Sequence, residues 1–535
     1  MLRTTFLLAT TILSLTGADP IIGITTGQLR GREIQTENIS LYAFEGVPFA
    51  SPPVGSLRFQ APVPAEPWEG IRDATKSGKC CISVNYNPSI ENEDCLFVNI
   101  YTPSRNITDP LPVMVNFYGG GFETGCATYD EFGSGPLVNE DVIVVTFNYR
   151  LGIYGFLSTG DDVILGNAGL KDQVFALKWV QQNIAYFGGD PGKVTIFGQS
   201  AGGISIGVHL MNKKSQGLYR AAICESGCSL IGLYQTDPKF NAYAAAKLLN
   251  IFITDQNTTE DIKNFLQSQP VETLSGLLNI GKVLIGVVLE AESDDAYVTQ
   301  LNFPLLESGD FNQVPLMLGN VNAEFLASGC ILTLAIAALY DLSVTNLIPP
   351  SLEALSGTDL TEVGNIIKEA YVGKSGSFVA NISQALELTS DNFVRPTIKQ
   401  AELQSNFSPV YLYEFSFVGT PSEGRDIIPG GGRVAHSDEL AYIFDNAAVP
   451  LKTYDDYLTR QRIVRLWSNF AKTMNPTPDV TDPLLNVTWP QVTPTNIQCL
   501  DIGATLEAKL NRKAGQLAMW NEVFYTYGTR PFKGF

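Results

Sequence analysis

Short runs of apolar and β-branched residues recur along the chain and predict buried strands. They occupy residues 113–117, 142–147, 194–197, 221–224, 314–318 and 410–415. Each run is apolar throughout, which is typical of a strand in a sheet covered on both faces. Between two of these runs, residues 167–187 carry apolar side chains at helical spacing. This alternation predicts an α/β fold with a large, mostly parallel central sheet and helices on both faces.

Two long stretches, residues 230–310 and 325–405, interrupt the alternation with helical patterns. We expect helical cap insertions over the strand ends, because sites in open α/β sheets lie at the carboxyl ends of strands. The 535-residue sequence shows no long Pro/Ser/Gly tract, charge block or fixed-period repeat. We therefore expect residues 19–535 to form a single domain.

The first eighteen residues have the pattern of a signal peptide. One positive residue, Arg3, precedes an apolar run from Phe6 to Leu15, and Gly17 and Ala18 precede Asp19. This pattern predicts removal of residues 1–18 during export. The apolar run is too short to span a membrane, and we expect no later run to reach spanning length. The predicted location is therefore secreted and extracellular, without a membrane anchor.

Cysteines and glycosylation sequons agree with an oxidising compartment. Six Asn-x-Ser/Thr sequons predict N-glycosylation, at Asn38, Asn106, Asn257, Asn381, Asn406 and Asn486. The eight cysteines lack the double Cys-x-x-Cys spacing of zinc sites, so we expect disulfides and no metal. Spacing leaves the connectivity open, because the adjacent Cys80 and Cys81 cannot both pair with Cys95.

The formal net charge of −19 excludes some classes of partner. Nucleic acid is not expected, because phosphate contacts need a basic face. Anionic lipid is disfavoured for the same reason. The charge favours a dispersed extracellular protein, and steering of cationic substrates is the alternative interpretation. Oligomeric state is not indicated.

A Gly-x-Ser-x-Gly motif follows the strand predicted at residues 194–197. Ser200 is its serine, and small residues that can start a helix come directly after it. A serine on a sharp strand-to-helix turn needs small neighbours, and the helix start then faces developing negative charge. A glycine-rich structural turn is the alternative. The position after a strand favours Ser200 as a nucleophile.

A glycine run, Gly119 to Gly121, follows the strand predicted at residues 113–117. Glycines at a strand end let backbone N–H groups approach a ligand closely. With the N–H of Ala201, the donors of Gly120 and Gly121 would form an oxyanion hole. A phosphate cradle lacks the expected Gly-Lys-Ser/Thr ending, so no nucleotide cofactor is predicted. A plain flexible loop is the other alternative.

A serine nucleophile needs a general base, and the chain contains two histidines. His209 lies in the helix after Ser200, less than three turns on, so we expect a packing role. His436 lies in a polar loop after the last clear strand, where this fold places its base. Glu324, shortly after the strand predicted at residues 314–318, is the expected orienting acid, and an ordinary helix-start glutamate is the alternative.

With these residues in place, the chain resembles the type-B carboxylesterase/cholinesterase family, of the α/β-hydrolase fold, across nearly its whole mature length. The matching segments are residues 46–59, 92–99, 118–122, 148–150, 169–173 and 198–203. The resemblance implies the triad Ser200, Glu324 and His436, and an oxyanion hole from Gly120, Gly121 and Ala201. It also implies that Ser226 supports the triad, that Arg58–Glu93 and Arg150–Asp172 form structural ion pairs, and that Cys95 pairs with Cys80 or Cys81.

Departures from the family pattern bear on substrate. The acid is usually followed by Gly, whereas Phe325 stands here. Cholinesterases hold a quaternary ammonium on a tryptophan, and this chain has Tyr86 and no Trp between Cys81 and Cys95. Juvenile hormone esterases look similar, but Gly203 and Arg433 depart from their usual motifs. Residues 436–444 are most similar to secreted arthropod esterases.

We therefore expect a secreted carboxylesterase that cleaves neutral or weakly polar esters through an acyl-serine intermediate, without metal or cofactor. Juvenile hormone esterase or cholinesterase-like specificity are alternatives within the same chemistry. A non-catalytic binding protein on the same fold belongs to a different class. It would lack a member of the triad, and the sequence has all three.

Overall fold

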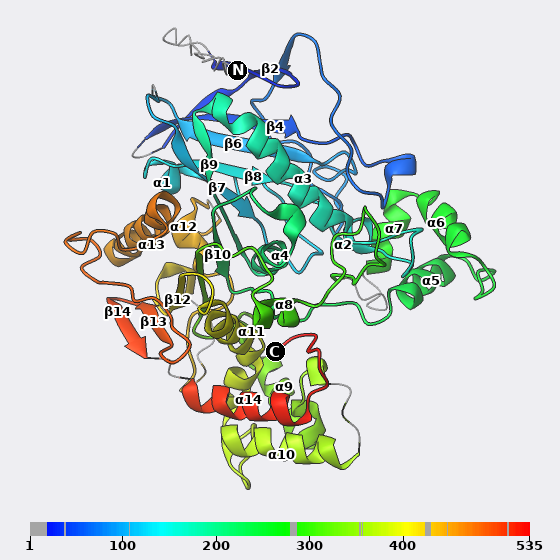
Figure 1. The fold of residues 1–535 in the computed structure, drawn as a ribbon, viewed down its shortest axis with the longest axis vertical. Coiled ribbons are helices and arrows are strands. Elements are labelled where there is room, and N and C mark those ends of the chain that lie inside the picture. Colours follow the sequence, from blue (N-terminus) through cyan, green and yellow to red (C-terminus); the bar gives the residue numbers. More distant parts are fainter. Residues whose placement is uncertain are drawn as a thin grey trace, which may run out of the picture.

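A mixed sheet forms the centre of the molecule in the computed structural model, which describes residues 19–36, 39–105, 107–278, 286–352, 355, 357–422, 428, 430–446, 448–510 and 513–535. Eleven strands make this sheet, in the order β14-β13-β12-β11-β10-β9-β7-β8-β6-β4-β3 (Figure 1). Their bounds are β3 (Arg32–Gln35), β4 (Ser40–Pro48), β6 (Phe97–Pro103), β7 (Leu111–Phe117), β8 (Ile143–Phe147), β9 (Gly189–Gln199), β10 (Ala221–Glu225), β11 (Leu316–Val321), β12 (Val410–Phe415), β13 (Gln498–Ile502) and β14 (Leu506–Leu510). A second sheet has the order β1-β2-β5 and contains β1 (Ile21–Ile24), β2 (Gly27–Arg30) and β5 (Ile71–Asp73).

The middle of the central sheet is parallel. Strand β7 pairs in parallel with β8 and β9, and β9 to β13 continue in parallel, one after another. Antiparallel pairs occur toward the two edges, where β14 pairs with β13, and β3, β4, β6 and β8 pair in turn. All six predicted strands are present, and the prediction of a mostly parallel sheet is confirmed. Their apolar composition follows from burial on both faces.

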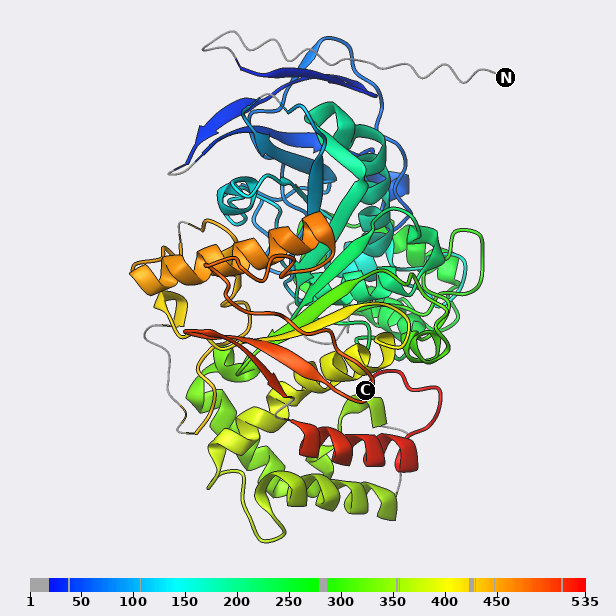
Figure 2. The ribbon, with the colours of Figure 1, turned by 60° about the vertical axis from the view of Figure 1, so that its left-hand side comes forward.

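Helices cover both faces of the sheet. Helix α3 (Ala168–Asn183) runs on into the 3-10 turn η2 (Ile184–Phe187), which confirms the helix predicted at 167–187. Helix α4 (Ala201–Leu210) lies on the same side, and α13 (Tyr454–Thr473) lies on the opposite side (Figure 1, Figure 2). A capping box between Thr453 and Asp456 starts α13. Helix α13 packs against β7 and β9.

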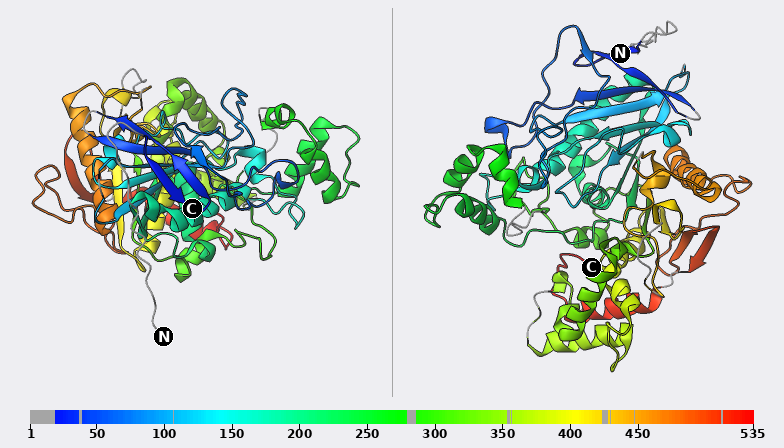
Figure 3. Two further views of the ribbon diagram at one scale, coloured as in Figure 1. Left: turned by 90° about the horizontal axis from the view of Figure 1, so that it is seen from above. Right: turned by 180° about the vertical axis from the view of Figure 1, so that it is seen from behind.

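The two insertions are helix-rich, as expected, but they extend in different directions. The first contains α5 (Pro238–Leu249), α6 (Thr259–Gln267), α7 (Val271–Leu278) and α8 (Asn302–Ser308). The second contains α9 (Gly329–Leu342), α10 (Thr358–Val372) and α11 (Ile382–Gln404). Helices α5–α7 form a lobe on one side, whereas α9 and α10 lie with α14 (Ala514–Tyr527) at the end of the molecule (Figure 1, Figure 3). Helix α11 packs on β11 and β12, so part of the expected cap belongs to the layer that covers the sheet.

Short helices connect the larger elements. The α-helical ones are α1 (Gly135–Val138), α2 (Gly152–Phe156) and α12 (Leu440–Ile443). The 3-10 turns besides η2 are η1 (Gly55–Leu57), η3 (Lys213–Ser215), η4 (Glu324–Ser328), η5 (Val344–Leu347), η6 (Pro350–Leu352) and η7 (Thr420–Ser422).

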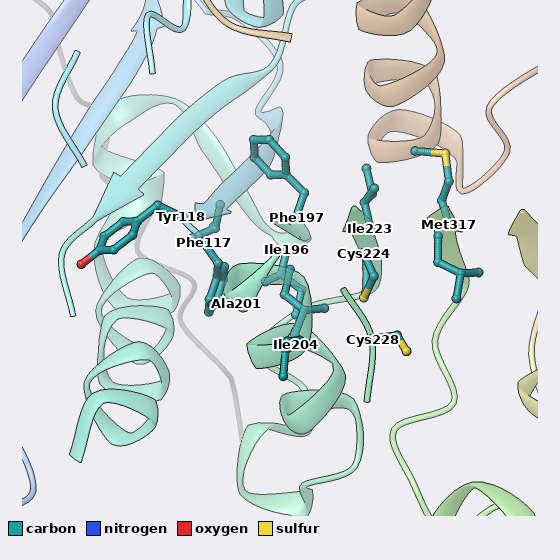
Figure 4. Packing of buried hydrophobic residues seen from close by; sticks show 14 of the residues in the cluster. Phe117, Tyr118, Ile196, Phe197, Ala201, Ile204, Ile223, Cys224, Cys228 and Met317 are labelled. Carbon is teal, nitrogen blue, oxygen red and sulfur yellow. The ribbon is translucent and has the colours of Figure 1, made fainter. Parts of the chain in front are cut away.

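A packed apolar core lies directly beneath the Gly-x-Ser-x-Gly turn. Figure 4 shows buried side chains from neighbouring strands with residues of α4 beside them, namely Phe117, Ile196, Phe197, Ala201, Ile204, Ile223 and Met317. Each of these side chains is at most a few per cent exposed. Protein interiors are closely packed and hold the backbone in place, so the turn lies on a rigid support.

Two disulfides and two buried ion pairs stabilise the first third of the chain. The disulfides are Cys80–Cys126 and Cys81–Cys95, so Cys81 is the partner of Cys95 that spacing left open. Arg58 contacts Glu93 at 2.6 Å, and Arg150 contacts Asp172 at 2.7 Å. Both pairs that the family resemblance implies are present.

One segment contradicts the expectation that no later run reaches spanning length. Residues Glu324–Leu342 form 19 helical residues with a mean hydropathy of 1.9, and 17% of the window is buried. The segment joins the 3-10 turn η4 to α9, and α9 alone has 14 residues. A single helix would need about 20 residues to cross a bilayer. The sequence did not indicate this length because Ser328 and Gly329 interrupt the apolar residues of the segment.

Candidate active site

The chain turns sharply at Ser200, between the end of β9 and the start of α4. Ser200 has φ 58° and ψ −123°, in a region that non-glycine residues rarely adopt and that costs about 1–3 kcal/mol. Its N–H donates to the carbonyl of Glu225 at 2.8 Å. A Cβ at Gly202 would lie 1.9 Å from the carbonyl oxygen of Phe117, so only glycine fits there. The small neighbours predicted from the motif are therefore required by contact with β7.

The glycine loop after β7 lies against this turn. A Cβ at Gly119 would lie 2.8 Å from the carbonyl oxygen of Gln199 and 3.0 Å from Cβ of Ser200. Gly120 and Gly121 follow with φ of 103° and 65° and are exposed. Ala201 is the first residue of α4, where backbone N–H groups lack helical partners. The three candidate oxyanion donors thus lie on two segments that meet at Ser200.

His436 and Glu324 are in direct contact. Nδ1 of His436 lies 2.5 Å from Oε2 of Glu324. The other carboxylate oxygen accepts the side-chain amide of Asn320 at 3.0 Å and the N–H of Val321 at 3.1 Å. The Glu324 side chain is fully buried, whereas the imidazole is 22% exposed. The carboxylate is therefore fixed by β11, and the ring faces the open side of the site.

The loops that carry these two residues are joined by backbone contacts. The N–H of Ala323 donates to the carbonyl of Val434 at 3.0 Å, and the N–H of His436 donates to the carbonyl of Glu324 at 3.3 Å. Oδ1 of Asn322 also accepts the N–H groups of Arg433 and Val434. The two loops therefore form one hydrogen-bonded unit.

The second ring nitrogen of His436 faces the residue before Ser200. The side-chain amide nitrogen of Gln199 lies 3.1 Å from Nε2. Because an amide nitrogen can only donate, Nε2 accepts, and the ring proton is on Nδ1, toward Glu324. Among the described residues, Nε2 thus has Gln199 rather than the Ser200 hydroxyl as its hydrogen-bond partner. This tautomer is the one that can accept a proton at Nε2.

The other histidine is fully buried away from this site. Nδ1 of His209 lies 2.6 Å from the hydroxyl of Tyr297, and Nε2 lies 2.8 Å from Oε1 of Gln173. Burial lowers the pKa of His209 to about 3, so the ring is neutral. The described contacts are those of a hydrogen-bonded core residue.

An apolar wall and a cavity adjoin His436. The ring of Phe393 on α11 lies 5.0 Å from the imidazole, and Phe325 lies 6.2 Å from Phe393, between ring centroids. Behind Phe325 is a small apolar cluster of Ala323, Leu326, Leu386, Ile428 and Ala435. On another side, a cavity of about 400 Å³ is lined by His436 together with the apolar residues Phe132, Pro421, Leu440, Ala441 and Val449 and the polar residues Glu131, Ser437, Asp438 and Asn446. The site therefore has an apolar wall on one side and a cavity of mixed character on the other. Among the described residues, no group of three or more His, Cys, Asp or Glu side chains could hold a metal ion.

Comparisons with known proteins give the family. Residues 18–520 match the carboxylesterase family. Cocaine esterase of Oryctolagus cuniculus is 36% identical over 498 residues, covering 86% of this chain and 88% of that protein. Juvenile hormone esterase of Tribolium castaneum is 33% identical over 518 residues, covering 89% and 87%. The chain belongs to the carboxylesterase family.

A solved structure agrees with this assignment. The juvenile hormone esterase of Manduca sexta, crystallised with OTFP covalently attached, superposes on this carboxylesterase with a TM-score of 0.83 at 29% identity. The match covers 94% of this chain and 99% of that one. The α/β-hydrolase fold and the family resemblance are confirmed, and the chain is a carboxylic ester hydrolase.

Behind the candidate triad, this carboxylesterase buries polar groups that sequence reasoning missed. Oε2 of Glu225, Oγ of Ser226, the hydroxyl of Tyr413 and both carboxylate oxygens of Glu439 are buried without a hydrogen-bond partner among the described residues. The remaining oxygen of Glu225 accepts the indole N–H of Trp467 at 2.5 Å. Each of the four side chains is at most 2% exposed.

Burial favours the protonated form of both Glu225 and Glu439. Burial raises the pKa of Glu225 to about 7, although the hydrogen bond from Trp467 acts in the opposite direction and lowers it. Burial, with the nearby charges of Glu324 and Glu225, raises the pKa of Glu439 well above its usual range. A protonated Glu439 adds no second negative charge beside Glu324. Only their positions in the sequence could have pointed to these two residues. Glu439 follows His436 by three residues, and Glu225 directly precedes Ser226.

Proposed function

We propose that Ser200, His436 and Glu324 form a catalytic triad that hydrolyses carboxylic esters through an acyl-serine intermediate. The observation that carries this proposal is the 2.5 Å contact between His436 and Glu324, with Nε2 directed at the residue next to Ser200. A buried carboxylate on Nδ1 fixes the tautomer and stabilises the imidazolium that forms during proton transfer. Membership of the carboxylesterase family supports the same assignment.

In the proposed first step, Nε2 of His436 removes the proton from Ser200 as the hydroxyl attacks the ester carbonyl. The N–H groups of Gly120, Gly121 and Ala201 hold the oxyanion of the tetrahedral intermediate. His436 then gives its proton to the leaving alcohol, and the acyl group stays on Ser200. His436 then takes a proton from water as the water attacks the acyl-serine, and returns it to Oγ of Ser200 as the carboxylic acid is released.

Formation of the Ser200–His436 contact would need a side-chain rearrangement. Gln199 occupies Nε2 in the structure, so its amide would be exchanged for the Ser200 hydroxyl when substrate binds. Such contacts are often loose in free enzymes and tighten around substrate. The neutral tautomer of His436 suits this exchange, since Nε2 already acts as an acceptor.

Ser226 is proposed to support the triad from behind. Its N–H donates to the carbonyl of Gly319 on β11, and its hydroxyl is buried beside Glu225. The strand end that carries Ser226 also holds the Ser200 backbone, through the Glu225 carbonyl. These backbone contacts link the Ser226 segment to β11 and to the Ser200 turn, and this link is the support that we propose.

Neutral or weakly polar esters are the proposed substrates. Phe325, Phe393 and the cluster around Leu386 make an apolar wall beside His436. Juvenile hormone esterase specificity is the second candidate, favoured by the Tribolium castaneum relative and the Manduca sexta structure. A panel that varies acyl length against alcohol size, with choline esters and their neutral isosteres, separates these possibilities.

Replacement of the nucleophile tests the proposed chemistry. Ser200→Ala should lower hydrolysis of a simple aryl ester by at least a thousandfold, and folded wild-type protein should be labelled on Ser200 by an organophosphate. Ser308→Ala, at an exposed position on α8, is the matched control and should retain full activity. Unchanged activity in the Ser200 variant would refute the assignment. Failure of labelling in folded wild-type protein would favour the non-catalytic alternative.

Export of a single catalytic domain, residues 19–535, is also proposed. The signal peptide at 1–18 and the sequons at Asn38 and Asn106 lie outside the described residues. Two disulfides support an oxidising compartment, and Asn381, Asn406 and Asn486 are exposed. Expression in a eukaryotic secretory host should release protein that begins at Asp19 and loses mass on treatment with an N-glycosidase. Retention inside the cell with an intact N-terminus would contradict the proposal.

A further inference from the structure

Helix α9 exposes most of its large apolar side chains, whereas its buried positions carry small side chains. Ile331 is 87% exposed, Leu342 79% and Leu339 50%, and Leu332 and Leu334 are nearly half exposed. The buried positions of the helix are Thr333 and Ala337. A surface helix of a soluble domain normally turns its large apolar residues inward. The opposite arrangement in α9 therefore needs an explanation outside the domain core.

The exposed side chains form one stripe. Residues 331, 334, 335, 338, 339 and 342 follow helical spacing and lie along the same face, over about 16 Å. No Lys, Arg or His occurs between Phe325 and Leu342, and the one acidic residue there, Asp341, is exposed beside the C-terminal end of the stripe. The stripe is therefore apolar and carries no basic residue.

Contacts near the C-terminal end of α9 hold the stripe outward. The hydroxyl of Tyr340 lies 3.1 Å from Oγ1 of Thr389 on α11, and the ring of Tyr340 lies 5.3 Å from that of Phe378. The carboxylate of Asp341 accepts the hydroxyl of Ser377 and the N–H groups of Phe378 and Val379. Helix α9 is thus anchored at its C-terminal end, in the orientation that exposes the stripe.

The stripe begins close to the proposed active site. Helix α9 starts at Gly329, five residues after Glu324, with only the turn η4 between them. Phe325 in that turn contacts Phe393, which contacts the His436 ring. An apolar surface bound along α9 would therefore lie next to the apolar wall of the site.

We propose that α9 docks this protein on an electrically neutral lipid surface. Anionic lipid does not fit, because the chain carries a net charge of −19 and α9 offers no basic residue. A second copy does not fit either, since a stripe about 16 Å long and one helix wide is far smaller than the roughly 800 Å² per partner of a stable interface. Apolar side chains without cations suit a zwitterionic headgroup layer, in which they reach the acyl chains.

The benefit for catalysis rests on the proposed function, whereas the binding itself does not. Apolar esters partition into lipid, so docking would raise their concentration beside the site. Vesicle binding is measured without turnover and can be tested on Ser200→Ala. A failure of the triad assignment and a failure of the docking proposal are therefore distinguishable.

Flotation with phosphatidylcholine vesicles tests the proposal. Wild-type protein and Ser200→Ala should float with the vesicles. The double variant Ile331→Glu, Leu342→Glu should lose at least tenfold in partition coefficient while hydrolysing a soluble aryl ester at the wild-type rate. The matched control is Ile251→Glu, Phe252→Glu, at positions 85% and 83% exposed on the loop after α5, and it should float like wild type.

Three results would overturn the proposal. The first is wild-type protein that stays unbound at millimolar phosphatidylcholine. The second is an equal loss of partition coefficient in the control variant, which would indicate non-specific binding through any exposed apolar residue. The third is a wild-type dimer, seen by sedimentation equilibrium, that the α9 variant dissociates, because a second copy would then cover the stripe. Weaker flotation when phosphatidylserine replaces part of the phosphatidylcholine would support a neutral surface.

Discussion

The side-chain amide nitrogen of Gln199 lies 3.1 Å from Nε2 of His436, although 237 residues separate them in the sequence. The contact places the imidazole beside the residue that precedes Ser200. It also places the side chain of residue 199 where a charge on it would act on Nε2 of His436. That influence can be measured.

Replacing Gln199 with Glu should move the acid limb of the pH–rate profile to higher pH. A carboxylate beside Nε2 favours the protonated imidazole, which cannot act as a base. The profile of kcat/KM for a neutral aryl ester, measured from pH 5 to 9, gives the shift, which we expect to be about one pH unit. Gln199→Ala is the control and should leave the limb near the wild-type position. If the acid limb of the Gln199→Glu profile does not shift, residue 199 does not lie beside the general base during catalysis.

Glu225 should make the protein less stable as the pH rises toward neutrality. Burial raises the pKa of this carboxyl from 4.5 to about 7, so the folded protein holds a proton that the unfolded chain releases. The contribution is complete below pH 4.5 and is lost as the pH rises through about 7. The difference corresponds to about 3 kcal/mol.

Glu225→Gln should remove this dependence, because the amide stays neutral and can still accept the Trp467 indole N–H. Denaturation curves at pH 5 and pH 8 should differ less in the variant than in wild type, by about 3 kcal/mol at most. Glu66→Gln, at an exposed position, should behave as wild type. Equal pH dependence in wild type and Glu225→Gln would show that this carboxyl is not the cause.

Asp172→Ala should strongly destabilise the protein. Asp172 is fully buried and accepts the backbone N–H, Nε and Nη2 of Arg150. Removing it leaves a buried guanidinium without its counter-charge, which costs about 3–5 kcal/mol. Asp310→Ala breaks the exposed pair with Lys213 and should change the free energy of unfolding by less than about 1 kcal/mol. Urea denaturation followed by tryptophan fluorescence compares the two.

Removal of either disulfide should destabilise the protein, and the loss should be greater for the disulfide that closes the longer loop. The Cys80–Cys126 bond closes 46 residues and the Cys81–Cys95 bond closes 14. Loop-closure entropy gives about 4 and about 3 kcal/mol, respectively. Paired Cys→Ser variants should therefore lose thermal stability in that order in scanning calorimetry. The reverse order would mean that the unfolded chain is constrained by something other than loop length.

Much of the fold follows from local sequence patterns. The central strands are apolar throughout because helices cover both of their faces, so continuous apolar runs located them. The histidine beside Glu324 could be chosen because the chain contains only two. His209 was excluded by its place in the helix after Ser200, and its buried hydrogen bonds agree with that expectation.

Other features depend on contacts that no local pattern encodes. Glu225 and Glu439 are two among 54 acidic residues, and only the tertiary structure buries both and brings their charges close enough to interact. The partner of Cys95 depends on the path of residues 80–95 in space. Helix α9 is a further example, because its apolar sequence does not by itself show that Ile331, Leu339 and Leu342 are exposed.

The hydrogen bonds that join the Glu324 and His436 loops hold the acid and the base in one rigid unit. Thermal displacement of either loop moves both residues together and preserves their 2.5 Å contact. Ser200 belongs to a different unit, since it is fixed to the β9–α4 turn and to β10. The two units contact each other at Nε2 of His436. Adjustment during turnover should therefore be concentrated at that one nitrogen, where Gln199 and Ser200 can exchange.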